Sequence, residues 1–242
     1  MLDVLLKIVV FIFGAILTSS NHCIASPPFS KHEQINYNSQ ASQDRFVECI
    51  LYGLLGKQDN GYYLEIGASH PIEHNNTYFF EKKYGWKGVS IDIDDGYKNR
   101  WPSIRQNPLL IEDATKSDYR LILKPFPQVI DYLSLDIDTN YDIVLRKIFL
   151  NDYIFKVITI EHDFYRFGDK FRKDEREILS SLGYYLLCPD VSVFFDRRDS
   201  IFEDWWVHPI AFPPDVFTKL TSLDLKGKSH DQLINIIRKL LE

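Results

Sequence analysis

Five short apolar runs, each with an acidic residue at or near its end, constrain the fold of this 242-residue chain more than any other feature. Runs of this length are typical of buried strands. In the segments between them, apolar residues recur at helical spacing. Strands that alternate with helices predict a parallel sheet with helices on both faces. We therefore expect an α/β fold with a mostly parallel, doubly wound sheet. The runs are 61–66, 87–91, 108–111, 129–135 and 155–160, and their acids are Glu65, Asp92, Asp113, Asp136 and Glu161.

The remaining elements are predicted from the same periodicities. Apolar side chains at helical spacing predict a helix over 43–55, and Ser42 is its candidate cap. We expect a closing hairpin of 183–187 with 191–195. Further helices are predicted at 77–84, 95–101, 116–123, 140–150 and 170–182, with a terminal one inside 225–241.

The five acids predict a ligand site at one edge of the sheet. Open α/β sheets bind ligands beyond the carboxyl ends of their strands, near the point where the strand order reverses. Acids in such places also cap the helix that follows, and for Asp118 capping explains the residue at least as well. Five acids in register favour the ligand site.

The turn from Glu65 to His70 follows the first strand. Gly67 permits a positive φ or a close approach of the backbone to a ligand. Asp92 lies 25 residues beyond Gly67, where an acid on the second strand commonly binds ribose hydroxyls. The turn lacks the second and third glycines of the dinucleotide fingerprint. It therefore favours a nucleoside-like ligand without phosphates.

The motifs around this turn resemble those of FkbM-type S-adenosylmethionine-dependent methyltransferases. The resemblance covers roughly residues 40–190. Its pieces are Ser42-Gln43-Asp44, 61–68, Asn76-Thr77, Glu81, 85–88, 130–136, 157–161, Ile178-Leu179 and Gly183-Tyr184. Two stretches depart from the family: 136–139 reads Asp-Ile-Asp-Thr in place of Asp-x-Glu-Gly, and 91–93 reads Ile-Asp-Ile in place of Ile-Glu-Pro.

The resemblance implies a Rossmann-like methyltransferase fold with S-adenosylmethionine as cofactor. Glu65, Gly67 and Ala68 would form the cofactor turn, with Glu65 near the methionine end. Asp92 would bind the ribose, and Asp113 with Ala114 would lie beside the adenine. Asp136 would sit near the methyl group and the acceptor. The implied activity is methylation of a hydroxyl on a sugar or small molecule.

Candidate bases and metal ligands lie beside these positions. Asp136, His162 and His70 are the candidate catalytic residues, and the two histidines are the candidate general bases. Each histidine could equally be a surface or hydrogen-bonded residue. Asp136, Asp138, Glu161 and Asp163 follow two neighbouring strands, and Mg²⁺ prefers such carboxylate oxygens. This arrangement resembles that of catechol-type methyltransferases. The alternative is a hydrogen-bonded acidic cluster beside the cofactor's sulfonium.

The N-terminal segment predicts export. Residues 4–17 are apolar except for Lys7, and small residues precede Ser26 as at a signal peptidase site. We expect a signal peptide or membrane anchor over 1–25, a linker over 26–38 and a methyltransferase-like domain over 39–242, exported or membrane-anchored. A buried N-terminal helix is the alternative.

Export conflicts with a cofactor that is made in the cytosol. Three explanations are open: the N-terminal segment is not an export signal, the compartment contains the cofactor, or the chain is a catalytically inactive binding or trafficking module, which is the alternative function. A glycan on the sequon Asn75-Asn76-Thr77 would favour that alternative.

The composition indicates which classes of partner the chain binds. The net charge is −6, and no basic run is interleaved with aromatics, so we expect a small-molecule or glycan substrate and no nucleic acid.

The three cysteines form no CxxC pair, which argues against a thiolate zinc site. We favour Cys49 and Cys188 as buried free thiols over a disulfide. The segment 203–209 is either a substrate lid or, as we favour, packs its two Trp rings against the core.

Overall fold

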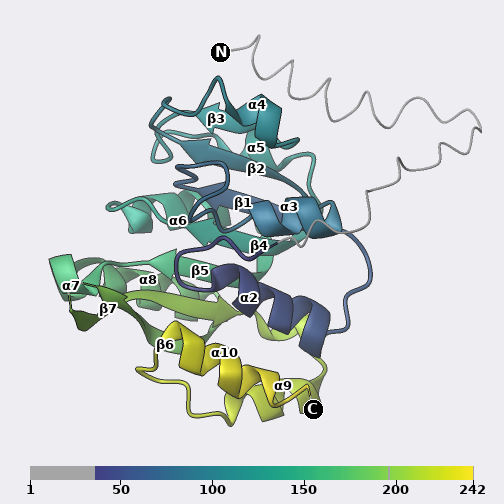
Figure 1. Ribbon diagram of the computed structural model, residues 1–242, viewed down its shortest axis with the longest axis vertical. Coiled ribbons are helices and arrows are strands. Elements are labelled where there is room, and N and C mark those ends of the chain that lie inside the picture. The colour runs from purple at the N-terminus through teal and green to yellow at the C-terminus, as the bar shows by residue number, and fades with distance from the viewer. Residues whose placement is uncertain (1–35, 196, 242) are drawn as a thin grey trace, which may run out of the picture.

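A seven-stranded sheet organises the computed structural model, which describes residues 36–195 and 197–241 (Figure 1). The strand order is β3-β2-β1-β4-β5-β7-β6. Strands β1 to β5 are parallel, and β7 runs antiparallel to both β5 and β6. The predicted Rossmann-like, mostly parallel sheet is confirmed. The strands are β1 Tyr62–Ile66, β2 Lys87–Asp92, β3 Leu109–Ile111, β4 Val129–Leu135, β5 Ile154–Glu161, β6 Tyr185–Phe195 and β7 Arg198–Val207.

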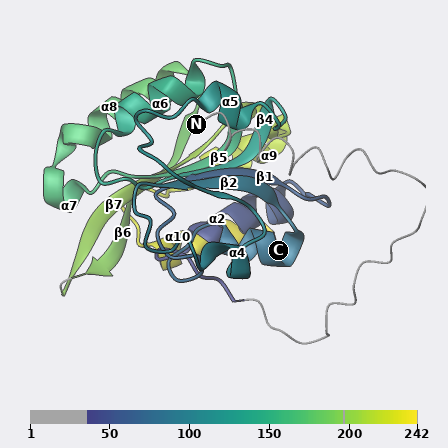
Figure 2. The same ribbon diagram turned by 90° about the horizontal axis from the view of Figure 1, so that it is seen from above.

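Helices cover both faces of the sheet. Figure 2 shows α5, α6, α7 and α8 on one face and α2, α3, α4 and α10 on the other. The described helices are α2 Gln43–Glu48, the π-helix η1 Cys49–Leu54, α3 Tyr78–Tyr84, α4 Trp101–Ile104, α5 Tyr119–Leu123, α6 Tyr141–Phe149, α7 Phe164–Phe167, α8 Asp169–Ser181, the 3₁₀-helix η2 Pro209–Ala211, α9 Pro214–Thr221 and α10 His230–Arg238.

Two hydrophobic cores result, one on each face. Side chains alternate between the faces along a strand. In β7, Trp205 therefore enters the core beside α2, η1 and α10, whereas Trp206 enters the core beside α6 and α8. Both rings are fully buried, which confirms that this segment packs against the core and does not form a substrate lid. Cys49 and Cys188 are buried and free, as predicted.

Two predicted elements are wrong. Segments 183–187 and 191–195 do not pair with each other, because β6 runs through both as one irregular strand and pairs with β7. The Pro189-Asp190 step is an irregularity within that strand, with Asp190 at φ 60°. The helix expected over 95–101 is instead a series of turns, and α4 begins at Trp101 with proline in its first turn, where a missing N–H costs nothing.

The predicted signal peptide or anchor over 1–25, and most of the predicted linker, lie outside the described residues. Within the described part of the chain, no helix is long and apolar enough to span a membrane.

A buried arginine ties the loop after β1 to α3. Arg105 is 3% exposed, and all five of its N–H groups have acceptors. Nε donates to Glu81 at 2.8 Å, and Nη2 donates to the Tyr63 hydroxyl at 2.9 Å and to Thr77 Oγ1 at 2.8 Å. Nη1 donates to Asn75 Oδ1 and to the Pro71 carbonyl.

We expect Arg105→Met to lower the free energy of unfolding by about 3–5 kcal/mol, because it leaves buried carboxylates without their cation. Urea denaturation followed by circular dichroism measures this. Arg120→Met, at an exposed position on α5, is the control and should change stability by less than about 0.5 kcal/mol. Equal effects of the two substitutions would contradict the role given to Arg105.

Candidate cofactor-binding site

A cavity of about 520 Å³ opens beyond the carboxyl ends of β1, β2, β3 and β4. This is the edge at which ligands bind in open α/β sheets, and the volume is typical of a small-molecule site. The cavity is lined by Ile66, Gly67, Ser69, Ile91, Asp92, Ile93, Asp94, Tyr97, Glu112, Asp113, Ala114, Thr115, Asp136, Ile137, Asp138, Thr139 and Asn140.

Gly67 lets two strand ends approach each other at the floor of the cavity. Its φ is +84°, and a Cβ there would lie 1.5 Å from the carbonyl oxygen of Asp136. The Gly67 N–H donates to the Ile91 carbonyl at 2.9 Å, and the Asp136 N–H donates to the Ile66 carbonyl at 2.9 Å. The sequence interpretation of Gly67 as a close-approach glycine is thus correct, although what approaches is the protein's own backbone.

Asp92 fixes the shape of the turn and also faces the cavity. Its Oδ2 accepts the Ser69 N–H at 2.7 Å, and its Oδ1 accepts the Asp94 N–H at 2.8 Å. Each oxygen keeps a second lone pair. Asp92 can therefore hold the β1 turn in place and accept hydrogen bonds from a ligand.

Asp113 and Ala114 line the cavity after β3, the strand next to β2. Asp113 Oδ1 accepts from the N–H and hydroxyl of Thr115, and Oδ2 pairs with Lys116 at 2.8 Å. The hydrogen bond and charge of Lys116, with the bonds from Thr115, hold the pKa of Asp113 down at about 2. The side chain is therefore ionised at neutral pH, and Ala114 offers a small apolar surface beside it.

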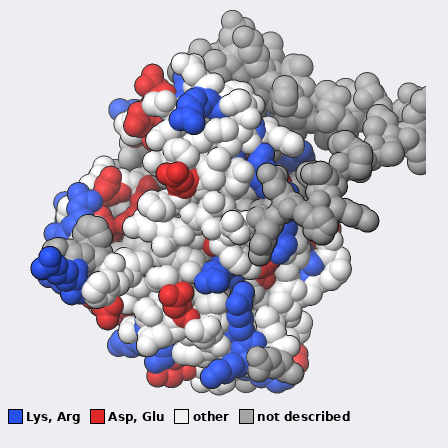
Figure 3. Space-filling model, in the orientation of Figure 1, with Lys and Arg blue, Asp and Glu red and all other residues white. Residues whose placement is uncertain are grey.

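The lining is strongly one-sided in charge. Six of its residues are carboxylates, and no Lys, Arg or His lines the cavity within the described residues. On the molecular face drawn in Figure 3, acidic and basic side chains are interspersed. Such a cavity attracts a cation and repels phosphate.

Asp136 and Glu161 form a hydrogen-bonded pair at the ends of β4 and β5. Burial raises the pKa of both groups, and the hydrogen bond between them raises that of Glu161 further. Glu161 is therefore the protonated partner, and Asp136, which lines the cavity, is the acceptor. The pair presents one negative charge to the cavity.

The four predicted Mg²⁺ ligands do not form a common ligand group. Arg166 Nη1 binds Asp138 at 2.6 Å and Asp163 at 2.8 Å, so a guanidinium already neutralises two of them. Glu161 contributes its proton to the pair with Asp136. The structure thus favours the alternative of a hydrogen-bonded acidic cluster.

Both histidines lie outside the lining of the cavity. His162 is fully buried, and its Nδ1 accepts the Phe164 N–H at 3.3 Å. His70 Nδ1 accepts the N–H groups of Ile72 and Glu73, while its ring packs edge-on against Tyr97. Neither ring lines the cavity, although His70 contacts the lining residue Tyr97, and a catalytic role for either histidine stays a prediction.

Glu65 and Ala68 support the cavity from behind. Glu65 is 1% exposed and accepts from Thr77 Oγ1 at 2.9 Å and Ser90 Oγ at 2.7 Å. Burial raises its pKa, and Arg105 opposes that rise. Ala68 is buried, and its N–H donates to the Ile91 carbonyl at 3.3 Å. Glu65 is not among the residues that line the cavity, and its contact with a cofactor stays a prediction.

The sequon asparagine is an internal residue. Asn75 is 1% exposed, and its Nδ2 donates to the Ala68 carbonyl at 3.1 Å. Its Oδ1 accepts from Arg105, Thr77 and Tyr78. A glycan on Nδ2 is incompatible with this packing, so the sequon gives no support to the binding-module alternative.

Sequence reasoning missed several lining residues, namely Ile93, Asp94, Tyr97, Glu112, Thr139 and Asn140. All of them come next to or after a strand-end acid that was identified. They could have been predicted from their position, because the loop that follows a strand lies at the same edge of the sheet as the last side chain of that strand.

No family model matches the chain, and no curated protein matches it in sequence. Solved methyltransferases are similar to it in structure. A precorrin-6y C5,15-methyltransferase from Geobacter metallireducens GS-15 has a TM-score of 0.47 and 13% identity, over 67% of this chain and 88% of that one. A magnesium protoporphyrin IX methyltransferase from Synechocystis PCC 6803 with bound SAM has a TM-score of 0.46 and 12% identity, over 72% and 88%. The similarity concerns the arrangement of the sheet and helices.

We expect Gly67→Ala to destabilise the domain strongly, because the new methyl group would collide with the Asp136 backbone. Gly56→Ala is the matched control, since Gly56 also has a positive φ but a methyl group there would meet no atom within 4 Å. The control should cost about 1–2 kcal/mol for the left-handed backbone alone. In Gly67→Ala, the steric overlap should increase the loss in free energy of unfolding by about 1–3 kcal/mol more. Thermal unfolding measures both losses. Equal losses would show that the strand ends are not in contact.

Proposed function

We propose that the chain is an S-adenosylmethionine-dependent methyltransferase that methylates a hydroxyl group on a sugar or small molecule. The observation that carries the proposal is the acidic cavity at the carboxyl ends of β1 to β4. The motifs that resemble FkbM-type methyltransferases contribute Ile66, Gly67 and Asp136 to its lining, and the predicted ligand residues Asp92 and Asp113 line it as well.

The charge of the cavity supports this cofactor over other nucleotides. S-adenosylmethionine carries a positive sulfonium and an ammonium group against one carboxylate, whereas dinucleotides and nucleoside triphosphates carry phosphates. Among the described residues, the lining has six carboxylates and no basic side chain, which favours S-adenosylmethionine. The absence of the second and third fingerprint glycines agrees with a ligand that lacks phosphates.

The proposed positions follow from the walls. Asp92 accepts the ribose hydroxyls through its remaining lone pairs, and Ala114 with Asp113 flanks the adenine. The turn at Gly67 lies beneath the methionine portion, with Asp136 nearest to the methyl group. In the reaction the acceptor oxygen attacks the methyl carbon, the carbon–sulfur bond breaks, and S-adenosylhomocysteine leaves as a neutral thioether.

Asp136 is the group we assign to the acceptor. Its carboxylate accepts the hydroxyl proton as the new bond forms, and the hydrogen bond from Glu161 orients it. Positioning supplies most of the acceleration in such a transfer. Magnesium has no place in this proposal, because Asp136, Asp138, Glu161 and Asp163 do not form a cluster with metal-ligand spacing among the described residues. Export by residues 1–25 stays a prediction, and an exported enzyme would need a supply of cofactor.

Isothermal titration with S-adenosylmethionine tests the cofactor. We expect Asp92→Ala to weaken binding at least about tenfold, a loss of about 1.4 kcal/mol. Asp95→Ala, an exposed neighbour outside the lining, is the control and should bind as the unchanged protein does. No heat with the unchanged protein, in the presence or absence of Mg²⁺, would favour the catalytically inactive binding module.

Catalysis is tested separately from binding. We expect Asp136→Asn to keep cofactor affinity within about threefold while methyl transfer falls by about 100-fold or more, the size of a general-base contribution. Transfer of radiolabel from methyl-labelled cofactor to a panel of monosaccharides and hydroxylated small molecules measures it. Cofactor binding without transfer to any of them would count against the hydroxyl acceptor, and an undiminished rate in Asp136→Asn would remove Asp136 from the reaction.

A further inference from the structure

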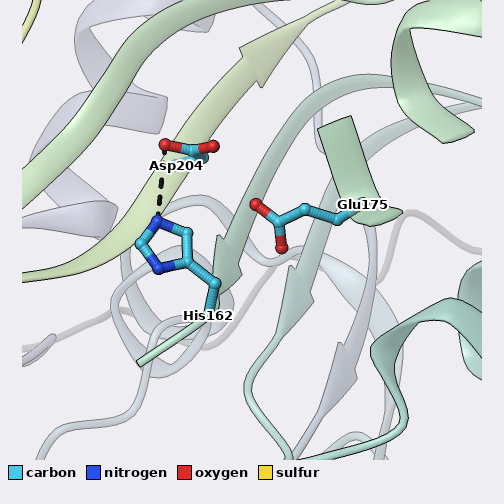
Figure 4. Close-up of side chains that lie close together, drawn as sticks. All are labelled: His162, Glu175 and Asp204. Carbon is cyan, nitrogen blue, oxygen red and sulfur yellow. Dashed lines mark ion pairs between the residues drawn. The ribbon is translucent and has the colours of Figure 1, made fainter. Parts of the chain in front are cut away.

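Three buried side chains from separate elements converge outside the lining of the cavity. His162 follows β5, Glu175 lies on α8 and Asp204 lies on β7, and Figure 4 shows their polar ends directed toward one another. One ligand atom from each lies within 4.8 Å of the other two. All three side chains are fully buried, and none lines the cavity.

Several polar atoms of this cluster lack a hydrogen bond of normal geometry. They are both carboxylate oxygens of Glu175 and His162 Nε2, which forms a long ion-pair contact with Asp204 at 3.5 Å. Tyr141 Oη and Asp163 Oδ1, on neighbouring segments, lack one as well, so these two residues, with Glu175 and His162, hold five of the ten such buried atoms in the described chain. A buried polar atom without a partner is costly, and a concentration of them points to a missing ion or water.

The spacing suits a small metal ion. His162 Nε2 lies 3.5 Å from Asp204 Oδ1. Tetrahedral zinc with bonds of about 2.1 Å holds its ligand atoms roughly 3.4 Å apart. His162 Nε2 and Asp204 Oδ1 therefore already have the required separation, and a carboxylate oxygen of Glu175 lies within 4.8 Å of the ligand atoms of both partners.

The surroundings of Asp204 hold it in place. Its Oδ2 accepts from Arg176 Nε at 2.6 Å, while its Oδ1 accepts from Arg176 Nη2 at 2.8 Å and from the Asp190 N–H at 2.7 Å. These bonds fix the orientation of the carboxylate as outer partners do around bound metals. The two bonds to Oδ1 use both of its lone pairs, so an ion at Oδ1 displaces one of the two donors.

The histidine must change tautomer to coordinate. Its Nδ1 accepts the Phe164 N–H at 3.3 Å, which leaves the ring proton on Nε2. Coordination by Nε2 places that proton on Nδ1 and gives up this one long contact. A metal–nitrogen bond replaces it.

We propose that His162, Glu175 and Asp204 bind one divalent zinc ion, with water as the fourth ligand, and that the ion ties α8 to β7 and to the end of β5. One imidazole nitrogen with two carboxylates favours zinc over magnesium or calcium, which prefer oxygen ligands alone. The ion would hold the segment that carries Glu161 and Asp163, next to the cavity. The inference is independent of the proposed methyl transfer.

Metal content and thermal unfolding test the site. Since the three side chains are buried, the ion enters during folding, so tag-free full-length protein is refolded from urea with ZnCl₂, with MgCl₂ or with neither, and then dialysed. We expect one zinc per chain by elemental mass spectrometry and a higher Tm after refolding with zinc only. Absence of bound zinc and of any Tm rise would overturn the site.

Matched variants locate the ion. Glu175→Gln keeps the size of the side chain but loses its charge, and it should lose both the zinc and the Tm rise. Glu177→Gln, exposed on the same helix, should retain both. Zinc retained by Glu175→Gln would place the ion elsewhere and overturn the assignment.

A measurement on the unchanged chain covers the case in which Glu175→Gln fails to fold. X-ray absorption of the zinc-refolded protein should show one imidazole among oxygen ligands. A sulfur-containing or histidine-free shell would overturn the assignment.

Discussion

The cavity depends on the Arg105 guanidinium more than on any other single group. Its N–H groups hold the loop from Pro71 to Thr77, and through Asn75 they reach the Ala68 carbonyl just after the Gly67 turn. Because Glu65 and Glu81 are buried, they need this cation nearby. The position of the β1 turn, and with it one wall of the cavity, therefore rests on a buried charge network rather than on strand pairing alone.

Ion pairs and a shared proton reduce the repulsion among the many carboxylates at this edge of the sheet. Those at the rim are matched by exposed cations, as Lys116 matches Asp113 and Arg166 matches Asp138. The deeper pair, Asp136 and Glu161, reduces its charge by sharing a proton. A net negative surface remains toward the cavity, which is the property a cationic cofactor requires.

The sequence predicted the sheet well because buried strands and helices have distinct apolar periods, and the five parallel strands all lie where those periods place them. It failed where the partner of a strand was decided by distant residues. β6 pairs with β7, and nothing in the turn-like Pro189-Asp190 step shows that β7 will fill the space beside β5. Strand-end acids were identified correctly, but their roles depend on which face each occupies.

Alternation along the strands sorts those acids into two groups. Asp136 and Glu161 follow Ser134 and Thr159 on the face of the core beside α2, so they meet at the cavity. His162 follows Ile158 and Ile160 on the opposite face, and Asp204 shares that face with Trp206, so both turn toward α8 and away from the cavity. A period of two places neighbours in sequence on opposite sides of the sheet. Glu161 and His162 therefore belong to different chemical sites while a single backbone segment joins them, and any ordering of His162 by the α8 cluster also orders Glu161 and, through it, Asp136.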